Sequence, residues 1–152
     1  RAEELAKKYA LAPYTMFIGS GALWGETILF SMCILEEMQW KRTRYITSAD
    51  FFHGTLELVE PGVPVFLFMG EDENRKLDER ARAFLTRGVT GDTDINIIDT
   101  AEFAIPGLDD EFRVIVSPWI LSSLITDRLA AYYETVTKHN LNYRRYYHQF
   151  DY

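Results

Sequence analysis

The sequence lacks the features that mark secreted, membrane-spanning and nucleic-acid-binding proteins. Its 152 residues include one cysteine, so no disulfide can form within the chain. The longest apolar runs fall well short of the about 20 residues that span a bilayer, and no signal peptide is recognisable. Acidic residues outnumber basic ones by 23 to 16, whereas nucleic acids select basic surfaces. We therefore expect a soluble, cytoplasmic protein that binds neither nucleic acid nor a membrane.

The composition is that of a globular domain. A hydrophobic fraction of 47% and a charged fraction of 26% are ordinary for such a protein, and the length predicts one domain with a sizeable core. Cys33 lies in the apolar run 28–35 and is interpreted as a buried thiol, with a catalytic thiol as the minor alternative. The chain opens at Arg1, without an initiator methionine, on helix-like sequence. We interpret residues 1–13 as the end of a linker helix from a preceding domain, and residues 14–152 as one domain.

Strand-like and helix-like segments alternate along the chain. Strands are predicted at residues 14–18, 44–47, 63–69 and 94–99. Helices are predicted at residues 2–10, 22–40, 48–59, 74–86 and 117–138. Ser117 and Pro118 indicate an N-cap and a first helical residue for the last helix, whereas residues 109–116 could be strand or helix.

This alternation predicts an α/β fold, a three-layer αβα sandwich around a mainly parallel sheet. The continuous apolar run 63–69 is typical of a strand that is covered on both faces. Ligands of such sheets bind beyond the carboxyl ends of the strands. The loops 19–21, 48–50 and 70–74 would gather at that edge.

The turn Gly19-Ser20-Gly21 is the first candidate for a binding site. Glycines between a strand and a helix let a ligand approach the backbone, and the helix N-terminus offers free N–H groups to an anion. However, Trp24 stands where a dinucleotide fingerprint has its third glycine. We favour the simpler interpretation, a tight strand-to-helix turn.

Two acidic residues and one histidine are candidates for proton transfer. Glu36 and Glu37 end an apolar helix, where a desolvated carboxylate would be a stronger base, although from these residues alone we favour two solvated glutamates. His53, between two phenylalanines and a glycine, could be an acid–base group or a core histidine. His139 and His148 have no acidic or cysteine neighbours at ligand spacing, so no metal site is expected.

The C-terminal tail combines arginines with aromatic residues. The run Arg144-Arg145-Tyr146-Tyr147 could bind phosphate, or it could fasten the C-terminus to the body of the protein.

Together these segments resemble one family. They are similar to the second sugar-isomerase (SIS) domain of the fructosamine-6-phosphate deglycases, and more distantly to the isomerase domain of glucosamine-6-phosphate synthase. The similarity rests on EMQW (37–40), TSADFFHG (47–54), ELVEPGVP (57–64), DERA (78–81), RRYY (144–147) and the terminal Tyr152. Both groups of enzymes place a catalytic glutamate sixteen residues before the histidine of a histidine–glycine pair, which is the spacing from Glu37 to His53.

The resemblance implies a fold, a reaction and roles for residues. The fold would be a flavodoxin-like SIS domain. Glu37 would move protons at C1 and C2 of an open-chain sugar, and His53 would act in ring opening or at the sugar oxygens, reaching the site of a neighbouring subunit in a homodimer. The substrate would be a phosphorylated sugar–amino acid, cleaved to glucose 6-phosphate and a free amino acid without metal or organic cofactor. Substrate contacts are expected at Ser20, Asp50, Tyr147 and His148.

The sequence also differs from the family pattern in three ways. Ser48-Ala49-Asp50 replaces the usual Ser-Gly-Glu, and His148 stands where the synthase has a reactive lysine, which the deglycases also lack. The Ser/Thr-rich phosphate loop of the family's first SIS domain is absent from these residues. The alternatives are another phosphosugar isomerase or aminotransferase-type SIS enzyme, and a non-catalytic module that binds sugar phosphates.

Overall fold

The computed structural model describes residues 1–88 and 90–151, and within them four short strands build one parallel sheet. The strands are β1 (Tyr14–Ile18), β2 (Arg42–Ile46), β3 (Val65–Met69) and β4 (Ile95–Asp99). Their spatial order is β2-β1-β3-β4, with every neighbouring pair parallel. This is the order of flavodoxin-like sheets, so the predicted fold class is confirmed.

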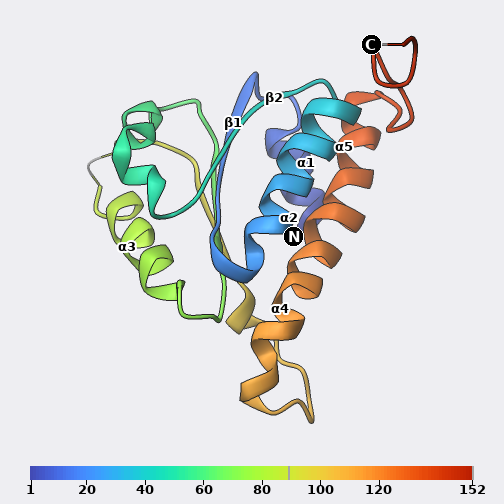
Figure 1. Cartoon of the computed structure of the whole chain (residues 1–152). Coiled ribbons are helices and arrows are strands. Elements are labelled where there is room, and N and C mark those ends of the chain that lie inside the picture. Colours follow the sequence, from blue (N-terminus) through green and yellow to red (C-terminus); the bar gives the residue numbers. More distant parts are fainter. Residues whose placement is uncertain (89, 152) are drawn as a thin grey trace.

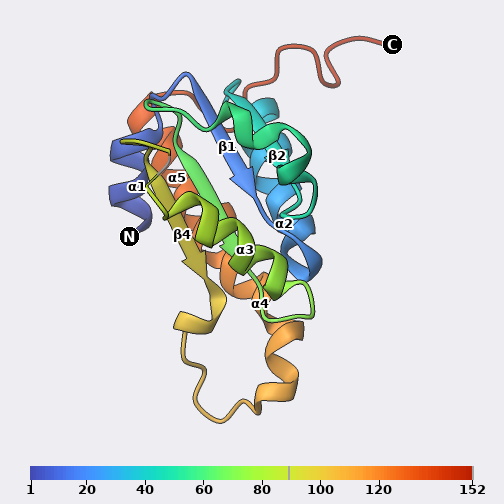
Figure 2. The same cartoon turned by 90° about the vertical axis from the view of Figure 1, so that its left-hand side faces the viewer.

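Helices cover both faces of the sheet (Figures 1 and 2). The longer helical segments are α1 (Ala2–Tyr9), α2 (Trp24–Ile28), η2 (Leu29–Met38), α3 (Arg75–Leu85), α4 (Arg113–Ser122), η7 (Ser123–Leu129) and α5 (Ala130–Thr137). Short 3-10 turns are η1 (Gly21–Leu23), η3 (Asp50–His53), η4 (Thr55–Leu58), η5 (Thr100–Glu102) and η6 (Asp110–Phe112). The predicted helix 48–59 is thus two 3-10 turns, separated at Gly54.

The sheet separates two hydrophobic cores because successive strand residues point to opposite faces. On one face, Phe17 stacks on Phe66 at a ring-centroid distance of 5.2 Å, and α1, η2, η7 and α5 pack over these rings. On the other face, Met16 and Ile18 pack with Phe51 and with α3. All five residues of β3 are buried, as the apolar run predicted.

The predicted start of the last helix is wrong. The helix is already formed at Arg113, so Ser117 and Pro118 lie inside it and residues 109–116 are largely helical. Pro118 has no N–H to donate to the carbonyl of Val114, four residues earlier. The Ser117 hydroxyl donates to that carbonyl instead, at 3.1 Å. The serine–proline pair resembles a helix start, but in this helix the serine hydroxyl supplies the hydrogen bond that the proline cannot make.

The long C-terminal helix Asp110–Thr137 is the one segment of the described residues that is apolar enough, over enough length, to cross a bilayer. Core helices of soluble proteins pass the same test, which makes it weak evidence for a membrane. Leu121, Ile125 and Leu129 of this helix are fully buried in the core against the sheet.

Candidate active site

The helix that carries Glu37 is not an ordinary α-helix. From Leu29 to Met38 it is a π-helix, closed by a hydrogen bond of 3.0 Å from the N–H of Gln39 to the carbonyl of Ile34, five residues earlier. π-Helical segments are rare and occur frequently at functional sites. Glu36 and Glu37 lie in its last turn, before the helix ends at Met38.

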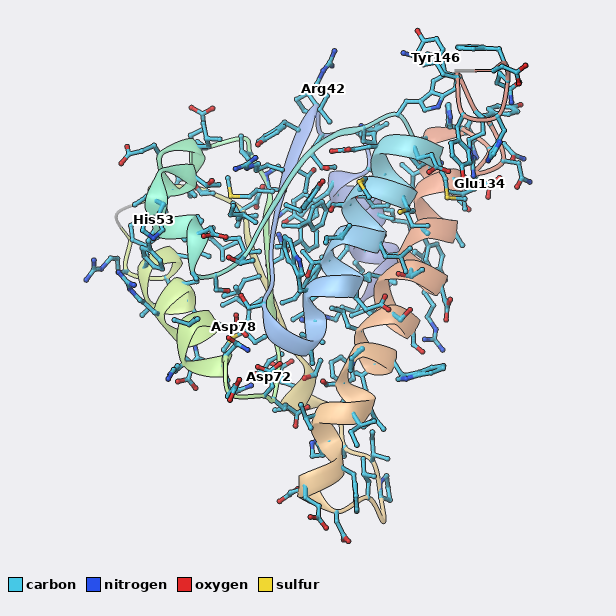
Figure 3. The ribbon with its side chains drawn as sticks, viewed as in Figure 1. Arg42, His53, Asp72, Asp78, Glu134 and Tyr146 are labelled. Atoms are coloured by element: carbon cyan, nitrogen blue, oxygen red, sulfur yellow. The ribbon has the colours of Figure 1, made fainter. Side chains whose placement is uncertain are left out.

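A pocket of about 580 Å³ lies at the end of this helix. Its walls come from the end of η2, the start of β2 and the C-terminal tail: Glu36, Glu37, Trp40, Lys41, Arg42, Arg144, Arg145, Tyr146 and Tyr147. Arg42 and Tyr146 mark this end of the molecule in Figure 3. Because β2 begins at Arg42, the pocket lies at the amino end of that strand and not at the carboxyl edge where ligands were expected.

Glu37 is held in this pocket by an ion pair. The Nε of Arg144 lies 2.9 Å from its Oε1, and both side chains are partly buried, with 21% of Arg144 and 33% of Glu37 exposed. Arg144 is fixed in turn, because it donates to the backbone carbonyls of Leu141 and Tyr143. The tail therefore does fasten itself to the body of the protein, and it does so through Glu37.

Glu36 has a different environment from its neighbour. The Thr43 hydroxyl donates to its Oε1 at 2.5 Å and so connects the end of η2 to β2. Glu36 and Glu37 are both partly buried and bonded, so the favoured sequence interpretation of two solvated glutamates is wrong.

The side chain of Arg145, the second arginine of the tail, lies over the ring of Trp40. The guanidinium of Arg145 lies 4.3 Å from the centroid of the Trp40 ring, and His139 meets the same ring edge-to-face at 4.4 Å. Trp40 has a φ of +53°, a left-handed conformation that is uncommon for a bulky residue. Such strain is typical of functional sites and here ends the helix while presenting the indole to the pocket.

His53 lies away from this pocket. It is exposed at the end of η3, beyond the carboxyl end of β2, and on the α3 side of the sheet (Figure 3). The preceding Phe51 and Phe52 pack on Phe84 of α3, which holds the segment on that face. Within one chain the sheet stands between His53 and Glu37.

The predicted contacts at Ser20 and Asp50 are occupied within the protein. Ser20 is buried and its hydroxyl accepts the N–H of Ser48 at 2.8 Å. Asp50 is exposed, and its carboxylate accepts the hydroxyl of Thr47 at 2.8 Å. Tyr147 does line the Glu37 pocket, whereas His148 is exposed and is not among its lining residues. Tyr152 lies outside the described residues.

Asp78 is a buried carboxyl that the sequence did not single out. It accepts hydrogen bonds from the Ser48 hydroxyl at 2.5 Å and from the N–H of Gly70 at 3.2 Å. Burial raises the pKa of Asp78 to about 6, against the opposing effect of these two hydrogen bonds. Together with the bond from Ser48 to Ser20, Asp78 ties together the carboxyl ends of β1, β2 and β3.

Asp72 occupies the anion position at the turn after β1. Its Oδ2 accepts the N–H of Ala22 at 2.5 Å, at the start of the helix that follows the turn. Gly21, at a φ of +55°, lies so close that any side chain there would collide with the Asp72 carboxylate. The protein's own carboxylate thus satisfies the groups that an anion would use, in agreement with a tight structural turn.

Metal-ligating residues do not cluster in the part of the chain that the structure describes. No group of three or more His, Cys, Asp or Glu side chains comes together there in a way that could hold an ion.

Comparison with known proteins gives the following relatives. No protein-family model matches the chain. The chain is 30% identical over 148 residues to fructosamine deglycase FrlB of Bacillus subtilis, a match that covers 95% of the chain and 43% of that protein. It is 36% identical over 116 residues to the fructoselysine 6-phosphate deglycase of Escherichia coli, covering 74% of the chain and 31% of that enzyme.

The fold has a counterpart among solved structures. A crystal structure described as a phosphosugar isomerase from Bacillus subtilis superposes with a TM-score of 0.88 at 29% identity, over 99% of this chain and 45% of that one. The chain therefore spans less than half the length of the relatives that it matches.

Proposed function

Because the chain is a homologue of the fructosamine and fructoselysine-6-phosphate deglycases with the fold of the phosphosugar isomerases, we propose that it supplies the acid–base half of a deglycase. The reaction is hydrolysis of a fructosamine 6-phosphate to glucose 6-phosphate and an amino acid, in a cytoplasmic homodimer. The observation that carries the proposal is Glu37: a partly buried carboxylate, oriented by Arg144, at the wall of a sugar-sized pocket.

Glu37 acts on the open-chain ketosamine. Its carboxylate removes a proton from C1, which is acidified by the C2 carbonyl and the attached nitrogen. The electron pair forms a C1–C2 double bond while the C2–O double bond opens and its oxygen takes up a proton. Returning the first proton to C2 moves the nitrogen lone pair into a C1–N double bond and leaves a protonated imine. Water adds to C1, the C1–N bond breaks, and the amino acid departs with a proton. The ion pair with Arg144 uses Oε1 of Glu37, and we assign the proton transfer to Oε2.

We assign His53 to the site of the neighbouring subunit. In one chain it lies across the sheet from the Glu37 pocket, on an exposed turn that a second subunit can meet. There it would transfer protons at the sugar oxygens during ring opening. This arrangement requires the homodimer.

The substrate's phosphate would be bound by residues outside this chain, in a preceding SIS domain to which residues 1–13 lead. Two observations support this. The anion position at the turn after β1 is filled by Asp72. It also lies at the carboxyl edge of the sheet, separated from the Glu37 pocket by five-residue strands that span roughly 15 Å. An extended hexose phosphate is shorter than that distance.

The test is product formation by the full gene product that contains this chain. Incubated with a fructosamine 6-phosphate in deuterium oxide, it is expected to release glucose 6-phosphate and the amino acid in equal amounts, with deuterium at C2 of the sugar. Failure to release either product from any fructosamine 6-phosphate would refute the proposed reaction. Sugar isomerisation without amine release would support another phosphosugar isomerase with the same Glu37 chemistry.

A further inference from the structure

The Glu37 pocket carries more positive charge than proton transfer at C1 and C2 requires. Its walls hold four basic and two acidic side chains, although acidic residues predominate in the chain as a whole. Arg144 is paired with Glu37, and Glu36 accepts a hydroxyl from Thr43. A site with surplus charge of one sign attracts a ligand group of the opposite sign. The surplus here is positive.

Arg145 is the first of the groups that remain available. Its guanidinium stacks on the indole of Trp40, which leaves the N–H groups at its edge free to point away from the ring. Within residues 1–88 and 90–151 no carboxylate lies within ion-pair distance of it. A stacked guanidinium is pre-oriented to bind a planar carboxylate through two parallel hydrogen bonds.

Lys41, next to Trp40, is the second available group. It is partly buried, and loss of hydration lowers the pKa of its ammonium. No carboxylate of the described residues lies within ion-pair distance of its Nζ. An ammonium that has lost water without gaining a partner is stabilised when an anion enters the pocket.

We propose that Arg145 and Lys41 bind the α-carboxylate of the amino acid that the reaction releases. This rests on the proposed function. In an α-amino-linked fructosamine, one carbon joins the carboxylate to the reacting nitrogen, so a substrate with C1 at Glu37 places its carboxylate inside this pocket. The phosphate is at C6, the opposite end of the sugar. The pair recognises the group common to all α-amino acids and selects them over simple amines.

The experiment compares two substrates that differ in one group. Fructosyl-glycine 6-phosphate carries the carboxylate and fructosyl-glycinamide 6-phosphate an uncharged amide. The full gene product is expected to prefer the first in kcat/KM by about 10–100-fold, the usual range for a charged hydrogen-bonded pair. Arg145→Gln should lower kcat/KM for the carboxylate substrate only, so that the ratio of the two kcat/KM values falls to about three or less. Lys41→Gln should reduce it partly.

Arg80→Gln is the matched control. Arg80 is also exposed and also stacks on an aromatic ring, with its guanidinium 4.0 Å from the centroid of Phe52, but it lies on the α3 face. It should leave the preference unchanged. Equal use of both substrates by the wild type, or an undiminished preference in Arg145→Gln and Lys41→Gln, overturns the proposal.

A binding experiment distinguishes a failure of this carboxylate assignment from a failure of the proposed deglycase function. Reduced analogues of the two substrates, in which the C2 carbonyl is a hydroxyl, cannot react but keep the carboxylate or the amide. Calorimetry should show tighter binding of the carboxylate analogue by the wild type and no such difference in Arg145→Gln. If both analogues bind equally while fructosamine 6-phosphates are still hydrolysed, only the carboxylate assignment fails. A loss of glucose 6-phosphate affinity in Arg145→Gln would assign the pair to the phosphate instead and overturn the proposal.

Discussion

At the residue scale, the adjacent carboxylates of Glu36 and Glu37 have different partners. Thr43 holds Glu36 against β2, whereas Arg144 of the C-terminal tail holds Glu37 at the wall of the pocket. Arg144 is a positioning residue, since its bonds to backbone carbonyls fix the guanidinium that fixes the carboxylate.

The first prediction separates the two glutamates. Glu37→Gln keeps the side-chain shape and an oxygen for Arg144 but removes the base, so kcat should fall by roughly 10²–10⁴-fold. Glu36→Gln is the neighbouring control and should change kcat by less than about threefold. The measurement is steady-state release of glucose 6-phosphate by the full gene product. Equal losses in both variants would show that neither is the specific base.

What the sequence revealed about this site came from spacing along the chain. The separation between Glu37 and His53 selected Glu37 over Glu36 through the family resemblance, and the tail arginines were recognised as a candidate group. The contact between Arg144 and Glu37 joins residues more than one hundred positions apart, and only folding brings them together. For the same reason Asp78 was missed, because its importance comes from burial beside Ser48.

At the element scale, the carboxyl ends of three strands are joined through one titratable group. Asp78 of α3 binds Ser48 after β2 and Gly70 after β3, and Ser48 binds Ser20 after β1. The Asp78 side chain has 1% of its surface exposed, so its ionised form is costly to keep there.

This arrangement predicts a specific pH dependence of stability. The pKa of Asp78 is about 6 in the folded protein and near 3.8 when unfolded, so the folded state binds the proton more tightly. The free energy of unfolding of the wild type, relative to Asp78→Asn, should therefore fall as pH rises from about 4 to about 6 and stay constant above that. Urea unfolding across this range measures it. Asp127→Asn, at an exposed position of η7, is the control for the loss of one negative charge. A difference between wild type and Asp78→Asn that does not vary with pH would contradict the assignment.

Elements with one clear sequence pattern were predicted well, and those with competing local signals were not. β1 was predicted to the residue, and β3 and α3 within two residues, because short apolar runs bounded by turn residues mark the two strands and an amphipathic pattern marks the helix. The last helix was placed four residues too late because Ser117 and Pro118 carry the local signature of an N-terminus. The π-helix of η2 has no sequence signature, since its hydrogen bonds depend on packing against η7 and β2.

At the scale of the whole molecule, the two ends of the sheet have different properties. The carboxyl edge carries internal hydrogen bonds at Asp72 and Asp78 and a pocket of about 520 Å³ with acidic walls, while the amino end of β2 carries the basic pocket beside Glu37. In Figure 3, Arg42 marks the amino end of β2, and Asp72 and Asp78 mark the carboxyl edge.

The difference between the two ends of the sheet predicts how the isolated chain responds to glucose 6-phosphate. If the phosphate is bound outside this chain, as we propose, the 152-residue chain should fold, show no deglycase activity and give no saturable heat with glucose 6-phosphate in calorimetry, whereas the full gene product should bind it. Binding energy from a non-reacting phosphate helps to position the sugar, so its loss affects the chemical step as well as affinity. Tight binding of glucose 6-phosphate by the isolated chain would place a phosphate site within these residues and contradict the half-enzyme account.

The most direct test of the central claim is complementation between two inactive variants of the full gene product. If Glu37 of one subunit works with His53 of the other, mixing Glu37→Gln with His53→Ala and allowing subunits to exchange creates heterodimers with one intact site. Random exchange makes half of the dimers heterodimers, so activity should return to about a quarter of the wild-type value. Each variant alone should remain inactive under the same exchange conditions. No recovery, with exchange demonstrated by mass spectrometry of the mixed dimers, would contradict a site shared between subunits.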